Sequence, residues 1–198
     1  MINIENTDII ERFGRLDIEK EVNVNRFCIG ILDRFGECLS NEQSIIEFPN
    51  VPKFVKESND LLEFIKLEKQ YLLFFNKIFE FNKNIVYIYA PGFIKLKGKD
   101  YDWIYDYLND EEKKQLQFLL KQRIYKKNNV IILTNLKHME LFVKMSFREI
   151  CFSNFFFCNT STVIIGNYEM NFPVYSLNSD FFEALILIAK ECQLNIRK

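Results

Sequence analysis

The sequence predicts an α/β domain of three layers, in which a mixed sheet with parallel central strands lies between helices. Two short apolar runs rich in β-branched residues, 85–90 and 130–134, are typical of strands buried on both faces. Helical periodicity surrounds them, and parallel neighbours require such crossover connections. A third observation is the pair of apolar segments within 150–165, which a polar turn separates and which predicts an antiparallel hairpin.

Length and composition favour one domain with a large core. The chain has 198 residues, which is enough for one sizeable core and too few for two. We therefore predict a single α/β domain over 1–198, with 1–52 as an N-terminal extension that contains a hairpin and 58–198 as the core. The 21 Phe and 9 Tyr indicate a ring-rich core or an apolar surface that meets a partner, and the core interpretation is favoured.

Charge and cysteine content exclude several classes of protein. A net charge of −1 gives no global attraction to nucleic acid or to an anionic membrane, so we expect neither partner. No apolar segment is long enough to span a membrane, and residues 1–6 do not resemble a signal peptide. The five cysteines form no C-x-x-C pair, and there is one histidine, so we expect no metal, no cofactor and reduced thiols in the cytoplasm.

The first elements are a hairpin and a long helix. Residues 26–32 read as a strand, and 37–39 read as its returning partner after a turn. The segment 61–82 has no Gly or Pro and repeats apolar residues at helical spacing, so it predicts a helix. Its apolar stripe is unusually wide. A partner helix, a subunit contact or burial within the monomer would each explain that width.

The middle of the chain contains two helices and the second central strand. Pro91-Gly92 stops the first strand, and a short helix carries Trp103. Asn109 or Asp110 then caps a helix that we expect to extend to about Tyr125. The strand 130–134 and a helix over 135–145 follow.

The last third changes to strand periodicity. Segments 150–152 and 155–158 read as strand and 162–165 as the returning strand. The piece 172–175 is expected at a sheet edge because Pro173 lacks an N–H. Asp180 with Glu183 predicts a capping box at the start of the final helix, and 194–196 is a short strand.

This order of elements resembles one half of the phospholipase D-like fold. A first strand ends in a Pro turn at Ile85–Pro91, and a long helix precedes the second strand, Val130–Thr134. A short helix and a hairpin follow, and the second hairpin strand ends in a Gly-polar pair at Thr162–Asn167. An edge segment and a final helix over Phe172–Cys192 complete the pattern, which covers about residues 84–192.

The resemblance implies a degenerate member of that family. The family's catalysis uses a His-x-Lys pair and a downstream Asp, in which the His is the nucleophile and the Lys stabilises charge. The corresponding hairpin here, 153–158, contains neither His nor Lys, and the single histidine, His138, precedes Met139 and Glu140. Degenerate members act as ligand-sensing or protein-binding domains, as in archaeal sugar-responsive transcription regulators. A winged helix of the kind found in such regulators is not recognisable in 1–57.

Other candidate sites have simpler interpretations. The carboxylates of 100–112 could hold Mg²⁺, although helix capping accounts for most of them. His138 and Glu140 lie two positions apart and therefore point away from each other on a helix. Lys95, Lys97 and Lys99 could contact phosphates but are typical of a solvated loop or edge. Gly-rich phosphate motifs and a G-x-S-x-G elbow are absent.

The leading hypothesis is a non-catalytic binding or regulatory domain that acts through a protein partner, through self-association as a homodimer, or through a small ligand. An immunity or anti-defence antagonist that masks a partner is an alternative. A metal-dependent hydrolase or phosphodiesterase using the 100–112 carboxylates is another. Ligands of α/β sheets bind at the carboxyl ends of parallel strands. We therefore predict a ligand-binding site at Pro91, Gly92, Thr134 and Asn135.

Overall fold

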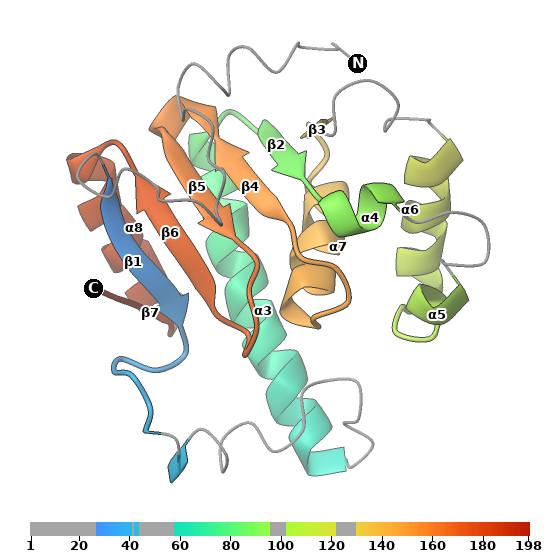
Figure 1. Ribbon diagram of the computed structural model, residues 1–198, viewed down its shortest axis with the longest axis horizontal. Coiled ribbons are helices and arrows are strands. Elements are labelled where there is room, and N and C mark those ends of the chain that lie inside the picture. The colour runs from blue at the N-terminus through green and yellow to red at the C-terminus, as the bar shows by residue number, and fades with distance from the viewer. Residues whose placement is uncertain (1–26, 41, 44–57, 96–101, 122–129) are drawn as a thin grey trace.

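In the part of the chain that the structure describes, seven strands form one sheet with helices packed on one side of it (Figure 1). The computed structural model describes residues 27–40, 42–43, 58–95, 102–121 and 130–198. The strands are β1 Cys28–Asp33, β2 Val86–Tyr89, β3 Val130–Leu133, β4 Asn154–Phe157, β5 Thr162–Ile165, β6 Phe172–Ser176 and β7 Asn195–Arg197. The helices are α3 Ser58–Phe81, α4 Pro91–Lys95, α5 Asp102–Tyr105, α6 Asp110–Lys121, α7 Leu136–Phe147 and α8 Ser179–Glu191, with a 3-10 turn, η4, at Cys158–Thr160.

The predicted fold class is wrong in its central feature, because every pair of neighbouring strands is antiparallel. The strand order is β3-β2-β4-β5-β6-β1-β7. The strands predicted as parallel neighbours, β2 and β3, pair antiparallel, with Tyr89 opposite Val130 and Val86 opposite Leu133. The connection through α4, α5 and α6 therefore returns the chain to the end of the sheet at which β2 finished. It does not cross the sheet to the opposite end, as a parallel neighbour would require.

Helices do connect strands that run in the same direction, but these strands are not neighbours in the sheet. Because neighbours alternate in direction, β3 and β4 run the same way with β2 between them, and α7 connects them. The same holds for β1 and β2 across α3, and for β6 and β7 across α8. One strand, β2, lies between β3 and β4, and one strand, β1, lies between β6 and β7, whereas the three strands β4, β5 and β6 lie between β2 and β1. Sequence periodicity finds the strands and the connecting helix but does not reveal such an insertion.

The N-terminal strand lies inside the main sheet. β1 pairs with β6 on one side and with β7 on the other, and residues 37–39 form no strand. Correspondingly, β6 is an interior strand, although Pro173 predicted an edge. The ladder between β6 and β5 ends at Val174, so Pro173 pairs with Ile31 of β1 alone. The missing N–H of Pro173 thus costs no ladder hydrogen bond on the β5 side.

Other local predictions agree with the structure or shift slightly. β4 and β5 form the predicted antiparallel hairpin through η4, while 150–152 is a bend followed by irregular chain and not a strand. β7 occupies the predicted last strand. The final helix is capped by Asn178, whose side-chain oxygen accepts from the backbone N–H of Phe181, and not by Asp180. Helix α7 is capped by Asn135 in the same way.

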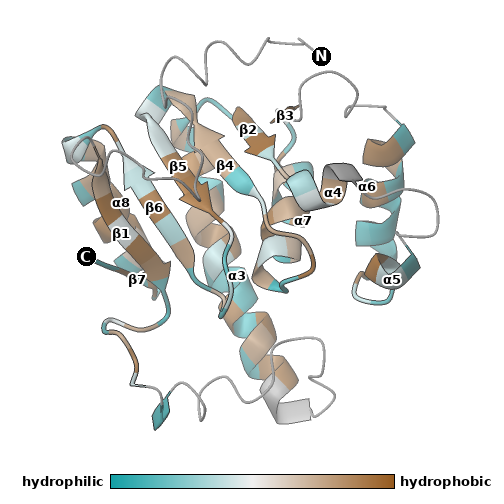
Figure 2. Cartoon of the chain, in the orientation of Figure 1, coloured by the Kyte–Doolittle hydropathy of each residue, from teal (hydrophilic) through white to brown (hydrophobic). Residues whose placement is uncertain are grey.

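The main core lies between the sheet and helices α3, α7 and α8. Apolar residues run along the strands and along α3, whereas α6 is largely hydrophilic (Figure 2). Rings on α3 mediate much of this packing: Phe75 contacts Phe155 and Phe172 at centroid distances of 4.9 and 5.3 Å. The ring-rich composition thus serves the core, as the favoured interpretation predicts.

Three further predictions concern membranes, cysteines and metals. None of the helices in the described ranges combines the length and apolar composition that a bilayer crossing requires. All five cysteines lie in described segments and are free thiols, but just two of them, Cys151 and Cys192, are buried. Within the described segments, no three His, Cys, Asp or Glu side chains come together as a metal site.

Candidate binding surfaces

The predicted ligand residues lie at two separate places. Pro91 and Gly92 begin α4 after β2, and Thr134 and Asn135 connect β3 to α7. Because β2 and β3 are antiparallel, these pairs lie at opposite ends of the two strands. At about 3.3 Å per residue, the separation along the strands is on the order of 20 Å. One small ligand therefore does not contact both pairs, and the binding role of each residue stays a prediction.

Asn135 lines a surface depression between α6 and α7. The depression has a volume of about 420 Å³, which lies within the range of small-molecule sites. It is lined by Glu111, Lys114, Gln115, Phe118, Asn135, Lys137 and His138. On α6 these residues follow helical spacing, and on α7 they occupy the cap and first turn.

An aromatic pair forms the apolar part of this depression. The rings of Phe118 and His138 stack with centroids 5.3 Å apart and an interplanar angle of 26°. Phe118 is 47% exposed and is one of several large apolar side chains that the described segments expose. Partial burial lowers the pKa of His138 below its ordinary value, so the imidazole is neutral at pH 7. Sequence reasoning did not identify Phe118, because a single apolar residue on the outer face of a helix carries no pattern.

Two lysines and one glutamate supply the charge. Lys137 Nζ lies 2.8 Å from Glu111 Oε1, and both side chains are about two-thirds exposed. That contact lowers the pKa of Glu111 and raises the pKa of Lys137. Lys114 is exposed on α6, one turn before Phe118. With a neutral imidazole, the lining carries one net positive charge.

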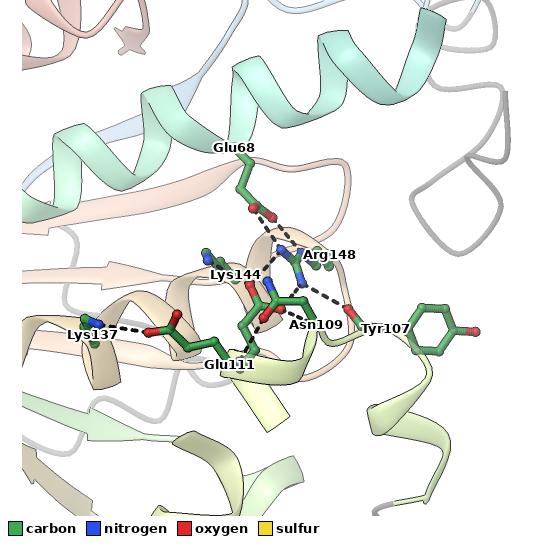
Figure 3. A network of polar contacts seen from close by, with 8 residues as sticks. Glu68, Tyr107, Asn109, Glu111, Lys137, Lys144 and Arg148 are labelled. Atoms are coloured by element: carbon green, nitrogen blue, oxygen red, sulfur yellow. Dashed lines mark hydrogen bonds and ion pairs between the residues drawn. The ribbon is translucent and has the colours of Figure 1, made fainter. Parts of the chain in front are cut away.

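Behind this surface, a buried polar network holds α6 against α3 and α7 (Figure 3). Arg148 lies at its centre, at the C-cap of α7. Its guanidinium donates to both oxygens of Glu68 on α3, at 2.6 and 2.9 Å, and to both oxygens of Glu112 on α6, at 2.9 and 3.2 Å. It also donates to the carbonyl of Tyr107 at 3.0 Å. The single planar cation thereby connects three segments with fixed geometry.

Glu112 is the most constrained carboxylate of the network. It is 3% exposed, it accepts from Lys144 at 2.8 Å, and it exchanges two backbone–side-chain hydrogen bonds with Asn109 in a capping box. Burial alone would raise the pKa of Glu112, but hydrogen bonds from Arg148 and Lys144 lower it to about 2. The predicted cap at Asn109 is therefore confirmed.

These contacts engage the carboxylates of 110–112, while Asp102 and Asp106, at and just after α5, are exposed. Glu112 pairs with Arg148 and Lys144, Glu111 pairs with Lys137, and Asp110 approaches Lys113 at 4.0 Å. Asp100 lies outside the described residues, as do Lys97 and Lys99. Glu140 accepts a hydrogen bond from Asn76 on α3. His138 stacks on Phe118 instead, so the structure does not bring His138 and Glu140 together.

The second face of the sheet carries a separate apolar cluster. The strand 85–90 was predicted to be buried on both faces, but the observed pattern alternates: Val86 and Ile88 are buried toward the helices, and Tyr87 and Tyr89 are half-buried on the other face. We call this group the second-face cluster. Its centre is Phe156, Val163 and Ile165, and its margin is Phe27, Tyr87, Tyr89, Val130, Cys158, Tyr175 and Leu177.

The described α-helices contribute no member to the second-face cluster, in which Cys158 comes from the 3-10 turn η4, whereas α-helices supply much of the main core. Phe27 and Tyr175 form an edge-to-face pair at 6.2 Å within the cluster. Tyrosines at the margin place apolar rings around a nearly dry centre, with Val163 at 0% exposure. The alternation of Val and Ile with Tyr in 86–89 is the sequence signal that would have identified this face.

Comparison with known proteins gives no family for this chain. No family model, no curated protein and no solved structure matches it. The resemblance to the phospholipase D-like fold is therefore untested and stays a prediction.

Proposed function

We propose that this chain is a non-catalytic binding domain that contacts a protein partner through the second-face cluster. The observation that carries the proposal is the composition of that face, where three apolar residues at the centre are surrounded by aromatic and aliphatic side chains. In a sheet with helices on one side, an apolar second face is normally covered by another layer. A partner protein would supply such a layer.

The chemistry of the face fits a protein better than a nucleic acid. Tyrosine, with an apolar ring and a polar hydroxyl, is enriched at protein interfaces. The three central residues are already buried in the isolated chain, so a partner would contact the half-buried margin, which contains Tyr87, Tyr89 and Tyr175. The charged residues of the described strands are Asp33 and Arg197, which pair with each other at 2.9 Å. A phosphate-binding surface would instead need several cations. The net charge of −1 likewise gives no attraction to a polyanion.

Site-specific photocrosslinking tests the proposal. The photoreactive residue p-benzoylphenylalanine replaces Tyr89 or Tyr175 in the cluster, or Tyr168 as a matched control that is 64% exposed outside it. We expect discrete protein adducts from positions 89 and 175 on irradiation in the cells of origin, and none from position 168. Equal labelling at all positions, or none at 89 and 175, would contradict the proposal.

The mass of the crosslinked adduct then distinguishes self-association from binding to a different protein. An adduct of twice the chain mass indicates self-association, and a different mass indicates another protein. An antagonist that masks a partner is one form of the second outcome. No described contact favours the hydrolase alternative, because the described carboxylates of 110–112 are engaged by cations. The cytoplasmic location expected from the cysteine content stays a prediction.

A further inference from the structure

We propose that the depression between α6 and α7 binds a small planar aromatic ligand that carries one anionic group. This site is separate from the second-face cluster, since none of its lining residues belongs to that cluster. The inference therefore does not depend on the proposed protein contact.

The aromatic part of the ligand is argued from the ring pair. Phe118 and His138 are already nearly parallel, at 26°, and Phe118 is 47% exposed. A third ring placed on the exposed surface of Phe118 would extend the stack and remove apolar area from water. The neutral state of His138 at pH 7 also favours stacking with an uncharged ring, because no cation has to be desolvated.

The anionic part is argued from charge. Glu111 neutralises Lys137 through the 2.8 Å contact, which leaves Lys114 as the excess cation of the lining. Lys114 and Phe118 are four positions apart on α6 and thus lie on the same helix face. A carboxylate or phosphate near Lys114 would be within reach of a ring stacked on Phe118.

The site is also held in shape before any ligand arrives. Asn135 Oδ1 accepts from the backbone N–H groups of Lys137 and His138, which fixes the first turn of α7. On the inner side of α6, Glu112 is bound by Arg148 and Lys144 from α7. Fixing both walls lowers the ordering cost of binding.

The single histidine makes the test direct. The chain contains one His, so the imidazole proton resonances in an NMR spectrum report His138 alone. The probes are indole-3-acetate, a ring with a carboxylate, and adenosine monophosphate, a ring with a phosphate. Indole lacks the charge, and cyclohexylacetate lacks the aromatic ring. We expect a saturable shift of the His138 signals with at least one of the first two probes, and binding at least about fivefold weaker for indole and cyclohexylacetate.

Two variants and a matched control complete the experiment. Phe118→Ala should weaken binding about fivefold to tenfold, and Lys114→Gln about threefold. The control is Phe81→Ala, which removes an exposed phenylalanine, at 59%, from another helix and should leave affinity unchanged. Both lining variants are at exposed positions and should retain the fold.

The outcomes are distinguishable. If indole-3-acetate binds and adenosine monophosphate does not, the site takes an aromatic carboxylate; the reverse result assigns a nucleotide-like phosphate. If neither charged probe gives a saturable shift at millimolar concentration, the proposal is overturned. It is also overturned if cyclohexylacetate binds as tightly as indole-3-acetate, or if Phe118→Ala binds as tightly as the native chain.

Discussion

Replacement of Arg148 by methionine should cost the protein a large part of its stability. The guanidinium donates to Glu68, to Glu112 and to the Tyr107 carbonyl, and Glu68 and Glu112 are just 8% and 3% exposed. Methionine preserves much of the apolar packing of the arginine stem but donates no hydrogen bond. The variant thus leaves two buried carboxylates without their shared cation.

The expected loss in the free energy of unfolding is about 3 kcal/mol. Removing one partner of a buried ion pair costs roughly 3–5 kcal/mol, and the lower end applies here because Lys144 still binds Glu112 at 2.8 Å. A loss of that size is a large fraction of the roughly 5–15 kcal/mol by which a domain is stable. Urea unfolding at pH 7, followed by far-ultraviolet circular dichroism, measures it directly.

Two control variants, measured by the same unfolding assay, test this explanation. Glu183→Gln breaks the Lys198–Glu183 pair, whose side chains are 61% and 65% exposed, and should cost less than about 0.5 kcal/mol. Neutralising Glu68 in the Arg148→Met background, with Glu68→Gln, should recover part of the loss, because Glu112 keeps its contact with Lys144 and no carboxylate of the network then lacks a cation. A loss below about 1 kcal/mol for Arg148→Met would refute this account of the network.

Three further changes test other parts of the structure by the same unfolding assay. The pKa of Glu112 lies at about 2 in the folded protein, below its ordinary 4.5, so it contributes about 3 kcal/mol to the free energy of unfolding above pH 4.5, and this contribution is lost as pH falls toward 2. Glu112→Gln should flatten that dependence, and an unchanged pH profile would contradict it. Asn82→Ala should lower the free energy of unfolding by about 2 kcal/mol, because the fully buried amide donates to the Ile78 carbonyl and accepts from the Thr160 N–H. A loss within error of zero would contradict that role. Gly166→Ala should cost about 1–3 kcal/mol, because an added Cβ would lie 2.8 Å from the Cβ of the buried Ser146, and a neutral result would mean that this contact relaxes freely.

The sequence predicted local structure better than topology. The strands and the helices α3, α6, α7 and α8 lie close to their predicted ranges, because hydrophobic period and capping residues are local signals. The error concerned the direction in which neighbouring strands pair. The sequences of 86–89 and 130–133 fit neighbouring strands of a parallel sheet as well as those of an antiparallel sheet. The relative direction of the two strands depends on where the intervening 40 or so residues lead the chain.

The candidate surfaces were harder to predict for the same reason. Phe118 and His138 are 20 positions apart and meet because α6 packs on α7. Glu68, Glu112 and Arg148 come from three separate segments, and each alone reads as an ordinary surface charge. Asn135 is the one predicted ligand residue that lines the depression, although it was proposed as part of a different geometry.

The position of β1 has a consequence for how the chain acquires its structure during synthesis. β1 pairs Leu32 with Phe172 and Cys28 with Ser176, partners that are translated about 140 residues later. The ribosome adds roughly 5–20 residues per second, so on the order of ten seconds pass between the synthesis of β1 and the synthesis of its partners β6 and β7. Contacts between such distant positions also slow the search itself. The β6-β1-β7 end of the sheet should therefore be the last part to form, and the nascent chain should carry an apolar, unpaired strand until then.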